Sequence, residues 1–110
     1  MFQFSMRKFM SDMVASGYSP DSIDATTYTG GESWEVDFLH NTSPQKVFLQ
    51  YDEIDNTYLV MYSVYLKDED GIITILTSDT FIMEDDRWVD NTGGSVTPPK
   101  IVLDTFQALH

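Results

Sequence analysis

The chain has no cysteine in its 110 residues. Disulfide bonds and thiolate metal sites are therefore excluded, and the fold has to depend on a hydrophobic core. A chain of this length is expected to form one domain, residues 1–110, that buries roughly 65% of its extended surface. The absence of cysteine is also compatible with a reducing compartment.

Long apolar runs are absent as well. No stretch approaches the ~18 consecutive apolar residues that a membrane-spanning helix needs. Near the N-terminus, Arg7 and Lys8 follow the first apolar residues instead of preceding them, and no run of signal-peptide length comes after them. We therefore expect a soluble, cytoplasmic protein with no membrane partner.

Basic residues are scarce: six Lys and Arg stand against 18 Asp and Glu, for a formal net charge of −12. This balance argues against direct binding to nucleic acid or to an anionic membrane through a basic patch. With 42% hydrophobic and 14% aromatic residues, the chain is too apolar for an acidic disordered tail. We expect a folded domain whose negative surface favours a protein partner with a basic surface.

Signatures of catalysis are missing too. His40 and His110 are the only histidines, and there is no nucleophile elbow, glycine-rich phosphate loop or zinc-protease helix motif. The acid-rich segments 52–56 and 68–71 lack the ligand spacing of an EF-hand. Paired carboxylates can hydrolyse glycosides, but so small a domain offers little room for a walled cleft. We expect no enzyme activity, no cofactor and no metal site.

The chain does contain a strong hairpin signal over residues 58–83. Two runs rich in β-branched and aromatic residues flank the segment Lys67-Asp-Glu-Asp-Gly71. A five-residue connection that ends in Asp-Gly is typical of a turn between antiparallel strands. In the first run, the residues that would point to one face and those that would point to the other are both mainly apolar. This predicts a strand that is covered on both faces and lies centrally in its sheet.

Two further strands are predicted before this hairpin. Residues 34–40 and 46–51 alternate between apolar and polar positions. The side chains expected to face inward are Trp34, Val36, Phe38, Val47, Leu49 and Tyr51. Turn residues at 41–45 and 52–56 provide short connections, which favour antiparallel neighbours. The four strands then form one antiparallel meander.

Helices are expected at both ends of the chain. Residues 2–14 carry apolar side chains at three- and four-residue spacings, which predicts an amphipathic helix that ends near Gly17. Ser19 and Pro20 favour a short second helical segment through about Ala25. Residues 97–99 resemble a helix start, so we interpret residues 100–109 as a short C-terminal helix; a fifth strand over 100–103 is the alternative.

The predicted fold class is α+β: a four-stranded antiparallel meander sheet with an N-terminal helix and a short C-terminal helix packed on one face.

Acidic residues concentrate in the sheet region. Residues 32–90 hold fourteen acidic and three basic residues, a net charge of −11. In an antiparallel meander the acidic connections at 52–55 and 84–86 should lie at one end of the sheet and that at 67–71 at the other, while Glu35 and Asp37 face outward. We expect these acids to form a negative band, for which solubility is the simplest explanation.

The functional hypothesis is that this band imitates a polyanion. Small, cysteine-free, acidic single domains are similar in composition to the nucleic-acid mimics and nuclease inhibitors of phages and mobile elements, a resemblance of class that no motif narrows to a family. It implies an inhibitor that occludes the basic, nucleic-acid-binding groove of a partner protein by pairing carboxylates with Lys and Arg. The expected partner-binding residues are Asp52, Glu53, Asp55, Asp68, Glu69, Asp70, Glu84, Asp85, Asp86 and Trp88.

Trp88 is the one large apolar residue in this set. Surrounded by charged residues, it either forms an exposed interface anchor or folds back onto the sheet edge. The alternative function is a homodimeric acidic chaperone or assembly factor, similar in outline to secretion chaperones. Such a dimer would hold its partner through an apolar groove lined by Met6, Met10 and Met13, although core packing is the simpler use of those methionines.

Overall fold

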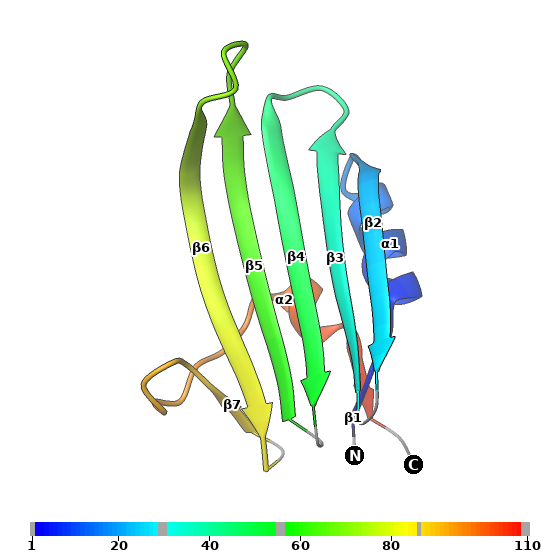
Figure 1. Ribbon diagram of the computed structural model, residues 1–110, viewed down its shortest axis with the longest axis vertical. Coiled ribbons are helices and arrows are strands. Elements are labelled where there is room, and N and C mark those ends of the chain that lie inside the picture. Colours follow the sequence, from blue (N-terminus) through cyan, green and yellow to red (C-terminus); the bar gives the residue numbers. More distant parts are fainter. Residues whose placement is uncertain (1, 29–30, 55–56, 86, 109–110) are drawn as a thin grey trace.

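The protein is an α+β fold built on one six-stranded antiparallel sheet (Figure 1), in a computed structural model that describes residues 2–28, 31–54, 57–85 and 87–108. The strands follow the chain in order as a meander: β2 (Tyr18–Tyr28), β3 (Gly31–His40), β4 (Gln45–Ile54), β5 (Thr57–Lys67), β6 (Ile73–Glu84) and β7 (Arg87–Val89). The helices are α1 (Met6–Ala15) and α2 (Lys100–Leu103), and β1 (Phe2–Phe4) pairs with β8 (Phe106–Ala108) in a separate two-stranded ribbon.

Both helices lie on the same face of the large sheet, behind it in Figure 1. The opposite face, which we call the open face, is covered by no described element. The hydrophobic core lies between the helices and strands β3–β5, where the rings of Phe9 and Phe38 meet edge to face with centroids 5.7 Å apart. Its fully buried members are Phe9, Met13, Val36, Phe38, Val47, Leu49, Tyr51, Val60 and Val102.

The strands predicted at 34–40 and 46–51 are confirmed as parts of β3 and β4. Successive side chains of a strand point to opposite faces, so the alternating apolar residues all reach the core side. Five of the six side chains expected to face inward are buried, and the sixth, Trp34, is partly buried against the core. Glu35, between two of them, is exposed.

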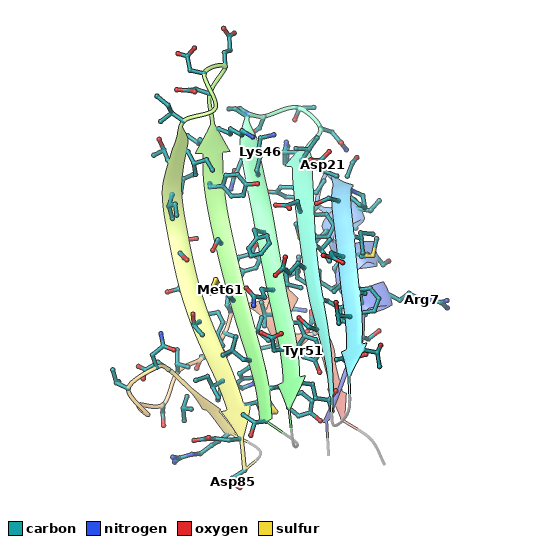
Figure 2. The ribbon with its side chains drawn as sticks, in the orientation of Figure 1. Arg7, Asp21, Lys46, Tyr51, Met61 and Asp85 are labelled. Carbon is teal, nitrogen blue, oxygen red and sulfur yellow. The ribbon has the colours of Figure 1, made fainter. Side chains whose placement is uncertain are left out.

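The central hairpin is also confirmed, because β5 lies between β4 and β6. The Asp68 carboxylate closes its turn by accepting hydrogen bonds from the backbone N–H groups of Asp70 (3.0 Å) and Ile72 (2.8 Å). The expected covering of β5 on both faces is wrong. Met61 (Figure 2) points to the open face, where no described element lies over it, and is partly exposed. Tyr65, opposite Lys46, points to the same face and is also partly exposed.

Strand β2 replaces the short helix predicted over residues 19–25, which is wrong. Residues 18–28 pair with β3 over its whole length, with Ile23 opposite Val36. The local helix signal of Ser19 and Pro20 is weaker than the ladder of backbone hydrogen bonds that the adjacent strand provides. Proline is tolerated there because β2 is an edge strand with a bulge beside Pro20.

Strand β7 is the other addition, so the predicted count of four strands is wrong and the sheet has six. Arg87–Val89 pair with Ile82–Glu84 of β6. A three-residue strand inside a charged segment has too little periodicity to be recognised, because at least four alternating residues are needed for that signal.

Helix α1 begins at Met6, four residues later than predicted, because Ser5 caps it. The Ser5 hydroxyl accepts a hydrogen bond from the backbone N–H of Lys8 (3.2 Å). Residues 2–4, predicted as helix, form β1 instead. Met6 and Met13 are buried in the core and Met10 is partly buried against it, so α1 uses its methionines for packing.

The C-terminal helix is confirmed, although α2 covers only residues 100–103, with Val102 buried. The alternative strand over 100–103 is therefore wrong. The predicted helix stops early because residues 106–108 form β8 and pair with β1, while the backbone N–H of Ser5 donates to the carbonyl of Thr105 (2.9 Å). Leu109, expected on the apolar side of this helix, lies outside the described residues.

Gly17 is required where α1 turns into β2. Its φ of +93° lies in the left-handed region, and a Cβ there would stand 3.3 Å from Nε2 of His40. The His40 ring cannot give way freely, because it packs edge to face on Tyr18 and accepts a hydrogen bond from the Thr42 backbone. We expect Gly17→Ala to lower the free energy of unfolding by about 1–2 kcal/mol or more in urea denaturation.

Gly71→Ala is the matched control for this prediction. Gly71 has φ +81° but no atom within 4 Å of a Cβ, so the control carries the backbone strain without the contact. Gly17→Ala should therefore destabilise more than Gly71→Ala; an equal loss would show that the His40 contact contributes nothing.

Candidate functional site

Four carboxylates gather on the open face over β2, β3 and β4. Asp24 and Glu35 are cross-strand neighbours. Asp37 follows Glu35 two residues later on the same face, and Asp52 lies on β4 opposite Ser33. We call these four residues, Asp24, Glu35, Asp37 and Asp52, the acidic face. Neighbouring strands are about 4.8 Å apart and alternate residues of one strand about 6.8 Å apart, so the acids form a closely spaced array of negative charge.

Two of these carboxylates accept hydrogen bonds from uncharged side chains. Asp37 accepts hydrogen bonds from the Tyr65 hydroxyl (3.1 Å) and the Ser22 hydroxyl (3.0 Å), and Asp52 accepts one from the Gln50 amide (3.0 Å). Burial, the nearby Asp37 charge and this hydrogen bond raise the pKa of Tyr65, which keeps the phenol protonated as a donor. The donors fix the orientation of the carboxylates and leave their charge in place.

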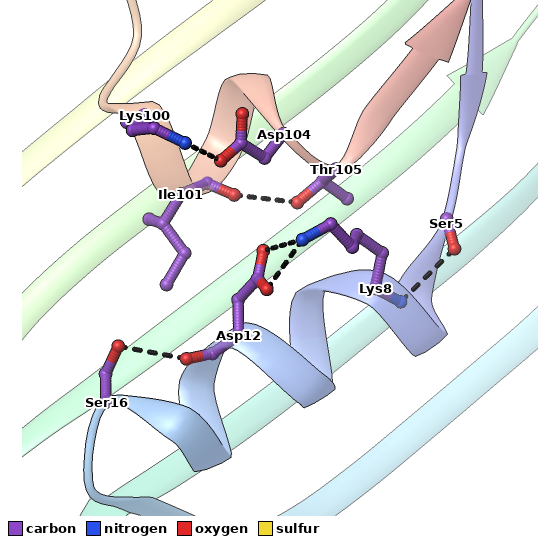
Figure 3. Close-up of polar contacts among 8 residues, drawn as sticks. All are labelled: Ser5, Lys8, Asp12, Ser16, Lys100, Ile101, Asp104 and Thr105. Carbon is purple, nitrogen blue, oxygen red and sulfur yellow. Dashed lines mark hydrogen bonds and ion pairs between the residues drawn. The ribbon is translucent and has the colours of Figure 1, made fainter.

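Ion pairs do not neutralise the acidic face within the described ranges. The ion pairs found there join Lys8 to Asp12 (2.7 Å) within α1 and Lys100 to Asp104 across α2 and its C-cap, on the covered side of the sheet (Figure 3). Lys46 shares the open face (Figure 2) and lies diagonally across from Asp37, but it belongs to neither of these ion pairs. The acids over β2–β4 therefore present net negative charge to the solvent.

The acid-rich connections lie where the meander was expected to place them. The turn with Asp68, Glu69 and Asp70 is at one end of the sheet, and Glu84 at the end of β6 and Asp85 in the turn after it are at the other (Figure 2). All five side chains are exposed. They extend the negative charge to both ends of the sheet.

Asp52 and Glu53, predicted as neighbours in a turn, lie in β4 and point to opposite faces. Glu53 is on the covered side, where its carboxylate accepts a hydrogen bond from the Tyr51 hydroxyl (3.3 Å). The structure thus separates these two residues and brings Asp52 together with acids of β2 and β3. Asp55 and Asp86, also predicted as site residues, lie outside the described residues.

Trp88 is partly buried and packs against the hydrophobic core. This is the second of the two arrangements considered for it, in which the ring folds back onto the sheet. Its position opposite Met83 on β6 explains the packing, because that register directs the ring to the helix-covered face.

Asp24 is the residue of the acidic face that the sequence did not indicate. Part of its strand, β2, was predicted as a short helical segment through about Ala25, so no outward row was assigned there. The segment from Ser22 to Thr27 does contain a signal, because Ile23 and Ala25 alternate with polar residues. Glu35 and Asp37 were expected to face outward in the same negative band as residues 52–55, but they were not among the expected partner-binding residues.

A groove of about 350 Å³ lies between the two helices. It is open to solvent and is lined by Asp12, Ala15, Ser16, Lys100, Ile101 and Asp104. Its acids are engaged by lysines, and no cluster of three or more potential metal ligands occurs in the described part of the chain.

No protein-family model, curated protein or solved structure matches this chain. Within the described ranges, the helices are too short and too polar to cross a membrane.

Proposed function

We propose that this protein is an acidic inhibitor that binds the basic, nucleic-acid-binding groove of a partner protein and occludes it. The observation that carries the proposal is the acidic face: four carboxylates in one contiguous array, on a sheet face that no described element covers. Such an array favours a surface rich in Lys and Arg, and it repels nucleic acid itself.

The geometry of the array supports charge pairing over a broad surface. A polyanion presents regularly spaced negative groups, and a β-sheet imposes a comparable regularity on side chains of one face. Hydrogen bonds from Tyr65, Ser22 and Gln50 orient two of the carboxylates before any partner arrives, which reduces the entropy lost on binding.

The exposed acids at the ends of the sheet have a secondary role in this proposal. Asp68, Glu69 and Asp70 at one end, with Glu84 and Asp85 at the other, enlarge the field that steers a basic partner toward the protein. In this proposal Trp88 does not contact the partner; it packs against the hydrophobic core and so stabilises the sheet that carries the acidic face.

The test compares two variants of equal charge. The open-face variant carries Asp24→Asn, Glu35→Gln, Asp37→Asn and Asp52→Asn; the end variant carries Glu69→Gln, Asp70→Asn, Glu84→Gln and Asp85→Asn. Each removes four of the 18 acids and brings the net charge from −12 to −8. Immobilised wild-type protein should capture nucleic-acid-binding proteins from a host lysate at low salt and release them in a salt gradient.

The open-face variant should bind the captured proteins roughly tenfold more weakly or worse, and should no longer block their binding to duplex DNA or RNA. The end variant should lose much less affinity and should still block. Equal weakening in both variants would show that net charge alone is responsible, and partners retained at high salt would contradict charge pairing.

A further inference from the structure

One edge of the large sheet is unpaired along most of its length. β7 pairs only with Ile82–Glu84 of β6, so residues 73–81 have no strand on their outer side within the described part of the chain (Figure 1). In such a strand alternate main-chain N–H and C=O groups point away from the sheet and can pair with a further strand. The unpaired stretch is longer than an average strand of about five or six residues.

Exposed apolar side chains lie along the same stretch of backbone. Ile72, Ile73, Ile75 and Leu76 are between 50% and 63% exposed. They are consecutive except for Thr74, and no charged residue occurs between Asp70 and Asp79. Exposed apolar residues that gather in one short stretch indicate an interaction site, whereas apolar residues scattered singly over the surface do not.

The opposite edge of the sheet is protected in the ways natural proteins use. β2 contains Pro20, a bulge beside it, and the acids Asp21 and Asp24. Proline, bulges and charges each hinder the pairing of a foreign strand, and β2 combines all three. β6 has a bulge near Leu76, but neither proline nor charge from residue 71 to residue 78. The chain thus protects β2 with all three features and β6 with a bulge alone.

We propose that residues 73–78 of β6 bind an extended segment of a basic protein, which adds to the sheet as a further strand. The occupant is defined by charge complementarity. Asp68, Glu69 and Asp70 lie beyond one end of the apolar stretch and Asp79 at the other, so a segment with alternating apolar side chains and flanking Lys or Arg fits.

A second copy of the chain fits this edge less well. Antiparallel pairing of two β6 strands about Ile75 would bring the acidic turn of each copy toward the lower half of the other β6, and each copy carries a net charge of −12. Like charges brought together across strands destabilise the pairing. The acids beyond the apolar stretch therefore select for a cationic segment and against self-association.

The proposed binding edge and the acidic face are accessible from the same side of the sheet. Ile73 and Ile75 pair with Lys67 and Tyr65, which places them on the open face of the sheet. A basic partner lying over the acidic face could therefore extend one strand to β6. The inference rests on the proposed function in this respect, because it takes the partner to be basic and specifies which of its elements binds.

The experiment uses a synthetic peptide, Lys-Arg-Val-Thr-Val-Thr-Val-Arg-Lys, titrated into the full chain with Kd measured by fluorescence anisotropy. We expect binding, together with slower amide hydrogen exchange at residues 73–78. Ile75→Lys should weaken binding at least about tenfold, since it places a charge on the edge. The matched control is Ile23→Lys on the opposite edge, an isoleucine of similar exposure (48%), which should leave Kd within about twofold.

Three results would overturn the inference: equal weakening in the two lysine variants, unchanged affinity for a peptide N-methylated on alternate residues, or no protection at residues 73–78. A solution mass of twice 12.6 kDa that Ile75→Lys returns to the monomer value would assign the edge to a second copy instead. Retained capture by the open-face variant contradicts only the proposed function, whereas the outcomes above contradict only the strand addition.

Discussion

Phe38→Ala should lower the free energy of unfolding by about 3–5 kcal/mol, the range for truncating a fully buried phenylalanine. Phe38 has no exposed surface and its ring meets Phe9 of α1 edge to face. Truncation removes apolar area from the centre of the helix–sheet interface and leaves a cavity that α1 cannot fill without moving. The measurement is equilibrium urea denaturation followed by circular dichroism and by tryptophan fluorescence.

Phe48→Ala is the matched control, because it truncates a phenylalanine on the open face of the sheet instead of the helix-covered face. Phe48 lies on the next strand, β4, opposite Asp37 on the open face, and is only partly buried. Because no described element covers it, its truncation should cost less than half as much as that of Phe38. Similar losses at both positions would mean that the open face is covered in solution, which would contradict its availability to a partner.

Much of this fold follows from local patterns. The strands around Val36 and Leu49 and the hairpin closed by Asp68 were predictable because alternation over many residues is a strong signal and the turn residues have specific chemistry. The stripe of α1 was predictable for the same reason. Each of these features depends on residues close together in the sequence.

The remaining elements depend on partners far away in the chain. β2 has a weak pattern of its own and forms because β3 offers it a ladder of hydrogen bonds. β1 and β8 pair across nearly the whole chain, with Phe4 opposite Phe106, so nothing near either segment indicates the ribbon. Long-range pairing of this kind overrides local propensity.

The candidate site was predictable in character but not in position. The excess of acids is visible in the composition, and Glu35 and Asp37 were expected to face outward. The acidic face as a unit needed the register, because Asp24 and Asp52 reach it from strands on either side of β3. For the same reason Glu53, one residue from Asp52, turned out to lie on the covered side. A shift of one residue decides the face.

Alkaline pH should destabilise the protein steeply, chiefly through Tyr51. Burial raises the pKa of Tyr51 far above its ordinary value of 10.0, and the Glu53 and Glu32 carboxylates raise it further. Above pH 10 the unfolded chain loses this proton while the folded protein keeps it, so the unfolded state binds fewer protons and stability falls as pH rises. Below pH 10 the contribution is complete.

The expected loss from Tyr51 is about 1.4 kcal/mol per pH unit, or roughly 2–3 kcal/mol between about pH 10 and pH 12. Burial also raises the pKa values of Tyr18, Tyr62 and Tyr65, which adds to the slope. Urea midpoints measured across this range, with phenolate absorbance recorded in parallel, test the prediction. Tyr51→Phe removes the titrating group from both states, so its stability should decline less steeply with pH than that of the wild type. Parallel slopes for the two proteins would show that Tyr51 ionises as readily in the folded state as in the unfolded chain.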